Sequence, residues 1–277
     1  MKYAPIGVFD SGYGGLTVLK ELVRVLPGYD FLYLGDNARS PYGTRSFDVV
    51  YKYTLQAVEY LFARGCPLVI LACNTASAKA LRNIQMLDLP DLAPENRVLG
   101  VIRPSVEKVA EITRNGHVGV LGTLGTVASG SYPVELEKWS DGRVVSTVQE
   151  ACPMWVPIVE NNEINSEGAD FFVRKNIQNI LEKDRKIDTL ILGCTHYPLL
   201  EDSIRKYVPD NVKILKQGHI VAEKLMDYLH RHPEMEQRLT KGESVRFYTS
   251  ESAKTFESKA SLFMEQHVQA ENFAWLE

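Results

Sequence analysis

The chain has 277 residues, of which 45% are hydrophobic and 24% charged, which is typical of a globular protein with a sizeable core. Its net charge is −4, and no cluster of Lys and Arg is interleaved with aromatic residues, so the composition argues against a nucleic-acid partner. The longest apolar runs, such as residues 68–73, are too short to span a bilayer, and residues 1–10 predict a strand instead of a secretory signal. We therefore expect a cytoplasmic protein with no membrane partner.

Short apolar runs rich in β-branched residues alternate with longer segments in which apolar residues recur every three or four positions. The predicted strands include residues 6–9, 31–34, 68–72, 98–102, 118–121 and 189–192. The predicted helices between them include residues 16–26, 47–64 and 167–183. Near-continuous apolar strands separated by helices predict parallel sheets that are covered on both faces, and thus an α/β fold.

The pattern of the first half of the chain recurs in the second. Residues 6–12 (IGVFDSG) are echoed by residues 118–124 (VGVLGTL), and residues 68–74 (LVILACN) are echoed by residues 189–195 (TLILGCT). Two echoes at similar offsets indicate a duplicated unit. We therefore predict two similar doubly wound domains with mostly parallel sheets, related by pseudo-twofold symmetry, with the active site in the cleft between them.

The predicted domain division follows from these echoes. Residues 101–210 are expected to form the second domain, and residues 1–100 together with 211–277 the first. The return of the chain to the first domain rests on residues 212–215 and 245–249, which look like further strands with no other evident place to pair.

Two of the four cysteines stand in echoing contexts. Four cysteines are too few for a disulfide scaffold in a chain of this length. Cys73 and Cys194 each follow a buried strand and precede a small polar residue. Because ligands bind at the carboxyl ends of parallel strands, both thiols are expected at the mouth of a site. A single Cys at a strand end is more often a small buried hydrophobe, and we keep that interpretation for Cys66 and Cys152.

Two thiols on opposite sides of one ligand suit racemisation. That reaction removes a proton from one face of a stereocentre and returns one to the other face, so it needs an acid and a base with the planar intermediate between them. A free thiol, with a pKa of about 8.5, can be shifted toward neutrality by nearby donors. Thiol and thiolate would then both be available.

Asp10 and His196 are candidate helpers of the two thiols. Asp10 ends the first predicted strand before the glycine-rich residues 11–15, and His196 lies two residues after Cys194, where it could relay a proton. Taken alone, an Asp before such a turn is more often a helix cap, and a lone His in a loop is more often solvated. Residues 35–43 also follow a strand and, taken alone, predict an ordinary turn.

Four motifs, in this order, resemble those of the glutamate racemases of the aspartate/glutamate racemase family, along nearly the whole chain. They are residues 7–16 (GVFDSGYGGL), 33–43 (YLGDNARSPYG), 72–76 (ACNTA) and 192–199 (LGCTHYPL). The resemblance implies a two-base enzyme, without PLP or another cofactor and without a metal, that interconverts L- and D-glutamate. It also implies a homodimer that supplies D-glutamate for peptidoglycan synthesis.

The resemblance further implies a role for each residue of the site. Cys73 would take the α-proton of D-glutamate and Cys194 that of L-glutamate, assisted by Asp10 and His196 respectively. The residues implied to bind the carboxylates and the ammonium group of the substrate are Asp10, Ser11, Tyr42, Gly43, Asn74, Thr75, Thr126, Thr195 and His196.

Two positions depart from the pattern of the family. Arg103 stands where many relatives carry an acidic residue, and Lys216-Gln217-Gly218 replaces a more usual Asp-Ser-Gly. Neither position belongs to the proposed acid–base residues. We therefore expect these departures to affect dimer contacts or regulation before they affect the chemistry.

Other functions stay open at this point. An aspartate racemase, or a decarboxylase that uses one of the cysteines, would share many of these features, although the presence of both cysteines speaks against a decarboxylase. A metal-binding module would use Cys73, Cys194 and His196 as three zinc ligands if they converge, but the usual Cys-x-x-Cys spacing is absent. A non-catalytic binding protein on the same fold is a third alternative.

Overall fold

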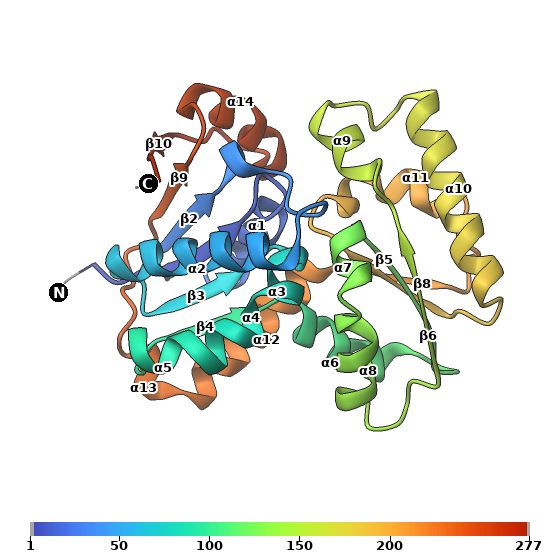
Figure 1. Cartoon of the computed structure of the whole chain (residues 1–277), viewed down its shortest axis with the longest axis horizontal. Helices are drawn as coiled ribbons and strands as arrows, with labels where there is room; N and C mark the ends of the chain where they lie inside the picture. The colour runs from blue at the N-terminus through green and yellow to red at the C-terminus, as the bar shows by residue number, and fades with distance from the viewer. Residues whose placement is uncertain (1–2, 276–277) are drawn as a thin grey trace.

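The computed structural model describes residues 3–275, so the outer limits of the predicted first domain, at residues 1 and 277, lie outside the described residues. Within that range the strands form two separate sheets, and every strand pair in both sheets is parallel. The two sheets lie side by side with helices around them (Figure 1). The α/β class predicted from the sequence is confirmed.

The first sheet has six strands in the order β10-β9-β2-β1-β3-β4. These strands are β1 (Ile6–Asp10), β2 (Phe31–Gly35), β3 (Leu68–Leu71), β4 (Arg97–Gly100), β9 (Val245–Thr249) and β10 (Ala270–Asn272). The second sheet has four strands in the order β6-β5-β7-β8. They are β5 (His117–Gly122), β6 (Ser146–Ala151), β7 (Thr189–Gly193) and β8 (Lys213–Leu215).

The strand orders show the duplication directly. The inner run β2-β1-β3-β4 of the first sheet has the same order as β6-β5-β7-β8 of the second. The echoed residues 6–12 and 118–124 contain β1 and most of β5, and the other echo contains β3 and β7. The predicted pair of similar doubly wound halves is therefore confirmed.

Helices connect the strands in both halves. The longer ones are α1 (Leu16–Val25), α2 (Phe47–Ala63), α6 (Ile102–Ile112), α8 (Ser131–Trp139), α10 (Glu167–Lys183), α12 (Gln217–Arg231) and α14 (Ala253–Met264). The shorter ones are α3 (Asn74–Lys79), α4 (Leu81–Asn83), α5 (Leu89–Leu92), α7 (Leu124–Ala128), α9 (Trp155–Glu160), α11 (Glu201–Arg205) and α13 (Pro233–Glu236). Single turns occur at η1 (Asn37–Arg39), η2 (Ile84–Asp88) and η3 (Tyr197–Leu200).

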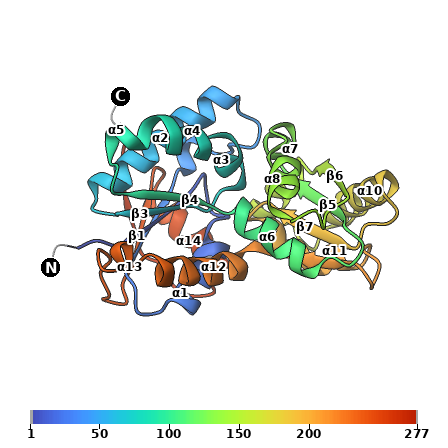
Figure 2. The same cartoon turned by 90° about the horizontal axis from the view of Figure 1, so that it is seen from below.

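The core follows from the alternation of side chains along each strand. In β1, Ile6 and Val8 pack in the same apolar cluster as α1 and α12, whereas Phe9 packs in the cluster that contains α2. Figure 2 shows α1 and α12 below the first sheet and α2 above it. Since both faces are covered, the strands are buried on both sides and read as continuous apolar runs in the sequence.

One strand lies in a different sheet from the one predicted. Residues 212–215 were expected to return to the first domain, but β8 pairs with β7 of the second sheet. The prediction is wrong because β8 is the counterpart of β4, so the second copy of the unit needs it to be complete. Residues 245–249 do return to the first sheet, where β9 pairs with β2.

Two smaller differences concern residue limits and edges. The strand predicted at residues 98–102 ends at Gly100, and Ile102 already begins α6, in whose first turn Pro104 is well tolerated. The edge strand β6 was not predicted, because its residues are half polar and only partly buried.

Among residues 3–275, no helix combines the length and the apolar character that crossing a bilayer requires.

Candidate active site

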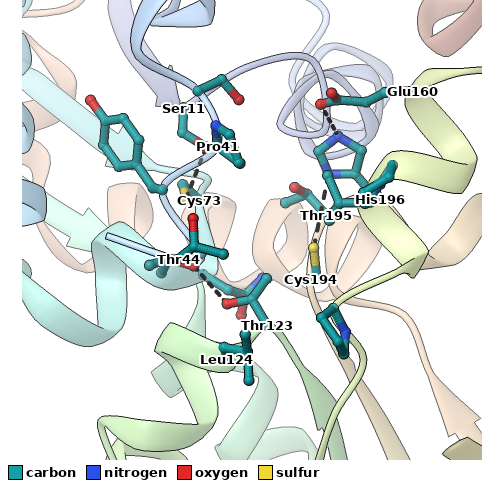
Figure 3. A pocket seen from close by; sticks show the side chains of 18 of the residues that line it. Ser11, Pro41, Thr44, Cys73, Thr123, Leu124, Glu160, Cys194, Thr195 and His196 are labelled. Carbon is teal, nitrogen blue, oxygen red and sulfur yellow. Dashed lines mark hydrogen bonds and ion pairs between the residues drawn. The ribbon is translucent and has the colours of Figure 1, made fainter. Parts of the chain in front are cut away.

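A cavity of about 350 Å³ lies where the carboxyl ends of β1, β3 and β7 meet. Both halves of the chain line it, and Cys73 and Cys194 project into it from opposite walls (Figure 3). Among the described residues that line it are the carboxylates of Asp10 and Glu160 and the imidazole of His196, but no Lys or Arg. The cavity can thus hold one small polar molecule between two sulfur atoms.

Most of the residues predicted for the site lie together in this cavity. The cavity-lining residues that were predicted from the sequence are Asp10, Ser11, Tyr42, Gly43, Cys73, Asn74, Thr75, Cys194, Thr195 and His196. Thr126 is the exception, because it is fully buried behind the cavity wall.

Cys73 occupies the position between a strand and a helix. It follows β3 and caps α3, where its sulfur accepts a hydrogen bond from the backbone N–H of Ala76 at 3.5 Å. The hydroxyl of Ser11 lies 3.6 Å from the same sulfur. Burial raises the pKa of the Cys73 thiol to about 12, and the negative charge of Asp10 adds to this effect. Cys73 is therefore a protonated thiol at neutral pH.

Asp10 ends β1 and is held by the turn that follows. One of its carboxylate oxygens accepts a hydrogen bond from the backbone N–H of Gly12 at 2.9 Å. The other oxygen, Oδ2, is buried and has no hydrogen-bond partner among the described residues. Burial raises the pKa of Asp10 above its usual range, and the charge of His196 opposes this shift. An acceptor is thus left unused beside the cavity.

The glycine-rich turn serves close packing. A Cβ atom on Gly14 would overlap the side chains of Thr195 and His196, and one on Gly15 would overlap Asp10. Both glycines have ordinary negative φ angles, so the absence of a side chain, and not a left-handed backbone, is what these positions require. The turn of the first half can therefore pack directly on the second half.

Cys194 is the counterpart of Cys73 after β7 and has a different partner. Its sulfur lies 3.8 Å from Nδ1 of His196, whose Nε2 lies 2.9 Å from the Oε1 carboxylate oxygen of Glu160. Burial alone would lower the pKa of His196, but the hydrogen bonds to Cys194 and Glu160 outweigh burial and raise its pKa to about 10. His196 is therefore a cation at neutral pH, and its Nδ1 atom faces the Cys194 sulfur.

Three threonine hydroxyls join the two halves at the cavity wall. Thr75 Oγ1 lies 3.0 Å from Thr123 Oγ1 and 3.3 Å from Thr126 Oγ1, and Thr123 donates to Thr126 at 3.1 Å. Beside them, the backbone N–H of Gly125 donates to the carbonyl of Gly43 at 2.7 Å. Thr126 thus supports Thr75 and Thr123 from behind.

The loop that carries Tyr42 and Gly43 is anchored by a buried carboxylate. Asp36 accepts hydrogen bonds from Tyr42 at 2.5 Å, Arg39 at 2.6 Å and Trp275 at 2.8 Å. The hydroxyl of Ser250 donates to Asp36 at 2.8 Å. Because the Tyr42 hydroxyl is engaged with Asp36, Tyr42 offers the cavity its ring and backbone.

Several lining residues were not predicted from the sequence. Glu160 is at the end of the short helix α9, in a stretch without a recognisable motif. Thr123 and Leu124 lie in the echo of the first glycine-rich turn, and that echo was a signal that could have found them. Cys152 also lines the cavity, but burial raises its pKa well above the usual range and so keeps it a neutral thiol.

The two departures from the family pattern lie in different surroundings. Arg103 is on the surface, where it stacks on Trp139 at 3.6 Å and pairs with Glu107 at 2.9 Å. Gln217 is buried and accepts a hydrogen bond from Asn74, a residue of the cavity lining. Gln217 thus hydrogen-bonds to a residue that the resemblance assigns to the substrate, and the expected effect of the two departures on dimer contacts or regulation stays a prediction.

The metal-binding alternative lacks the required geometry. Within residues 3–275, no three His, Cys, Asp or Glu side chains are arranged as metal ligands would be. Cys194 and His196 instead form a hydrogen-bonded series with Glu160.

The duplicated α/β fold and the two thiols that face one cavity define an enzyme of the racemase class. The profile of the Asp/Glu/Hydantoin racemase family matches residues 6–225, and the chain belongs to this family. It is 38% identical to a glutamate racemase of Streptococcus gordonii over 98% of this chain and 99% of that protein.

Solved structures agree with this assignment. The fold is similar to that of a glutamate racemase isoform from Bacillus anthracis, with a TM-score of 0.88 and 34% identity over 99% of this chain and 98% of that one. It is also similar to the glutamate racemase from Francisella tularensis in complex with D-glutamate, with a TM-score of 0.86 and 30% identity over 100% of this chain and 98% of that one.

Proposed function

We propose that this protein interconverts L- and D-glutamate by a two-base mechanism. The observation that carries the proposal is the pair of thiols, Cys73 and Cys194, which follow equivalent strands of the two halves and line one cavity. A planar intermediate held between them would meet one sulfur on each face. The relatives named as glutamate racemases support glutamate as the substrate.

The charges of the site support a defined first step. We assign the first base to Cys194, because its sulfur faces the His196 cation, whereas Cys73 keeps its proton at neutral pH. The Cys194 thiolate takes the α-proton of L-glutamate, and the electron pair of the broken C–H bond passes into the planar carbanion. Cys73 then donates its proton to the opposite face, which gives D-glutamate and leaves Cys73 as the thiolate.

The reverse reaction starts from the state that the forward reaction leaves behind. Cys73 is then the base for D-glutamate, and Cys194, now a thiol, is the acid. Asp10 is placed to help at the Cys73 side, because its Oδ2 atom is buried and unused. His196 stabilises the thiolate form of Cys194 whenever that form returns.

The lining of the cavity suits an amino acid with two carboxylates. We assign the substrate's ammonium group to the part of the cavity that is lined by the carboxylates of Asp10 and Glu160. The carboxylates of the substrate are assigned to hydroxyl and amide donors, because the described lining contains no Lys or Arg. These donors are Ser11, Asn74, Thr75 and Thr195, with the backbone of Tyr42 and Gly43 beside them.

The wider role of the protein is part of the same proposal. We propose that it supplies D-glutamate for peptidoglycan, as implied for its family, in the cytoplasm and as a homodimer. A reducing compartment suits the mechanism, because both thiols must stay free. We also propose that residues 3–100 with 216–275, and residues 101–215, act as two domains around the substrate.

The proposal is tested by replacing each thiol separately. Cys73→Ala and Cys194→Ala should each reduce racemisation at least about a thousandfold, because a general acid or base contributes on the order of 10²–10⁴ in rate. Each variant should still eliminate HCl from one enantiomer of a β-chlorinated glutamate, since that reaction needs a single base. Circular dichroism follows racemisation, and incorporation of solvent deuterium at Cα reports proton removal.

Cys66→Ala is the matched control, because Cys66 is also a buried free thiol but is not among the residues that line the cavity. It should racemise glutamate at close to the wild-type rate. A Cys73→Ala or Cys194→Ala enzyme that did the same would rule out the two-base scheme. Faster turnover of L-aspartate than of L-glutamate by the wild-type enzyme would instead indicate an aspartate racemase.

A further inference from the structure

The two segments that connect the halves of the protein meet at one buried side chain, Gln217. The first connection runs from β4 into α6 at Val101, and the second runs from β8 into α12 at Gln217. Gln217 is 3% exposed, and its Nε2 atom donates to Ser105 Oγ at 2.8 Å and lies 3.2 Å from the carbonyl oxygen of Val101. One amide side chain thus links both connections.

The same side chain reaches the wall of the cavity. Asn74, the residue after Cys73, donates from Nδ2 to Gln217 Oε1 at 2.6 Å. Tyr132, on α8, donates its hydroxyl proton to Asn74 Oδ1 at 2.7 Å and accepts from Gln217 Nε2 at 2.9 Å. The three side chains therefore form a closed ring in which each one both donates and accepts.

The contacts of Gln217 outside the ring fix the direction of both amide groups. Ser105 gives its hydroxyl proton to the carbonyl of Val101, so the group of Gln217 that faces both of them must be the N–H donor, and the same nitrogen donates to Tyr132. The carbonyl oxygen of Gln217 then faces the amide nitrogen of Asn74. Since all three residues are nearly or fully buried, water does not compete for these hydrogen bonds.

We propose that Gln217 is a positioning residue, which holds the side chain of Asn74 in the orientation that binds substrate and ties that orientation to the two connecting segments. The inference rests on the proposed function, because Asn74 is assigned there to the substrate. A change at the connecting segments is transmitted to the cavity wall beside Cys73 through the ring of Gln217, Tyr132 and Asn74.

A ring that served only stability would have a different signature. Loss of buried hydrogen bonds lowers the free energy of unfolding whatever the role of the residues. A positioning role additionally changes the Michaelis constant of the folded enzyme, because a free Asn74 amide must be ordered again each time substrate binds. The split between KM and kcat therefore separates the two roles.

The main test compares Gln217→Met, which keeps the length of the side chain but removes its hydrogen bonds, with Lys216→Ala. Lys216 is the adjacent residue on the same connection, is exposed, and pairs with Glu201 at the surface. We expect Gln217→Met to raise KM for both glutamate enantiomers about tenfold, which corresponds to about 1.4 kcal/mol, because the substitution removes the hydrogen bonds that Gln217 makes to Asn74 and Tyr132. We expect kcat to change less than about threefold and Lys216→Ala to match the wild type.

Tyr132→Phe breaks the same ring from the other side while keeping the aromatic packing. It should raise KM as Gln217→Met does, and the double variant should be no worse than either single one, because both substitutions open one ring. If Gln217→Met does not fold, Tyr132→Phe decides the question. Unchanged KM values in a folded, active Gln217→Met or Tyr132→Phe enzyme, with only a lower melting temperature, would overturn the proposal.

A readout without substrate keeps this inference separate from the proposed function. The side-chain amide protons of Asn74 should give resolved NMR signals that exchange slowly with water in the wild type and in Lys216→Ala, and quickly in Gln217→Met. Slow exchange in a wild-type enzyme that does not racemise glutamate would refute the function and leave the ring intact. Fast exchange in an active wild-type enzyme would refute the ring and leave the function intact.

Discussion

The imidazole of His196 lies 2.9 Å from the carboxylate of Glu160, measured from Nε2 to Oε1. Its other ring nitrogen faces the Cys194 sulfur, so the ring stands between a carboxylate and a thiol. Cys73 has a hydroxyl and a backbone N–H as its neighbours and no imidazole. The duplicated fold thus places two chemically different thiols at equivalent positions, and the difference between them supports several predictions.

Glu160→Gln should weaken the His196 cation. His196 has a pKa of about 10, raised above its ordinary value, so its contribution to stability is fully present below about pH 6.5 and is lost as the pH rises through 10. Without the Glu160 charge, the proton should leave at lower pH, which an NMR titration of the imidazole would detect. We expect kcat/KM for L-glutamate at pH 8 to fall about tenfold or more, because hydrogen bonds to charged groups contribute about 1.5–3 kcal/mol.

Glu163→Gln is the control for that change, because it removes an equal charge from an exposed position three residues away. Its His196 titration and its activity should match those of the wild type. If the midpoint of the His196 titration were the same in Glu160→Gln and Glu163→Gln, the carboxylate would have no part in holding the proton.

Gly14→Ala should damage the site by steric overlap. The added Cβ would meet Thr195 and His196, so the turn or these side chains must move. We expect a loss of about 1–3 kcal/mol in the free energy of unfolding and a fall in activity of more than about tenfold. Gly28→Ala is the control, since nothing lies within 4 Å of its Cβ position. Urea unfolding and a racemisation assay on both variants would check this, and equal behaviour of the two would contradict it.

The sequence was most informative where the chemistry depends on local pattern. Cys73 and Cys194 were predicted because each ends an apolar strand in a repeated context, and parallel sheets bring such ends together. Glu160 was missed because it reaches His196 from α9, a helix that no local pattern connects to β7. A contact between distant segments of one half depends on how its helices pack on the sheet, which a single sequence does not encode in any one segment.

The ring around Gln217 illustrates the same limit. The Lys216-Gln217 departure was visible in the sequence, but its consequence was assigned to dimer contacts or regulation. Gln217 is separated from Asn74 by 143 positions in the chain, and only the meeting of the two connections brings them within 2.6 Å. The placement of β8 was wrong for a related reason, because the extent of the repeat is clear from strand pairing and weak in the sequence.

Asp36→Asn should release the loop that carries Tyr42 and Gly43. The carboxylate receives the Arg39 guanidinium and the hydroxyl of Tyr42, so an amide there leaves the arginine without its counter-charge. Breaking a buried ion pair on one side costs about 3–5 kcal/mol, which urea unfolding would measure. Trp275→Phe removes a single hydrogen bond to Asp36 and should cost about 1 kcal/mol. Equal losses in the two variants would show that Asp36 is not the main anchor of the loop.

Alkylation should distinguish the two thiols in the wild-type enzyme. The thiolate is the reactive form of cysteine. Cys194 has the His196 cation beside its sulfur, whereas burial raises the pKa of Cys73 to about 12. Iodoacetamide at pH 7 should therefore label Cys194 before the other three cysteines, as mass spectrometry of the peptides would show, and bound D-glutamate should slow this labelling. His196→Gln should remove the preference for Cys194. Equal labelling of Cys73 and Cys194 in the wild type would contradict the asymmetry from which the first step of the reaction was argued.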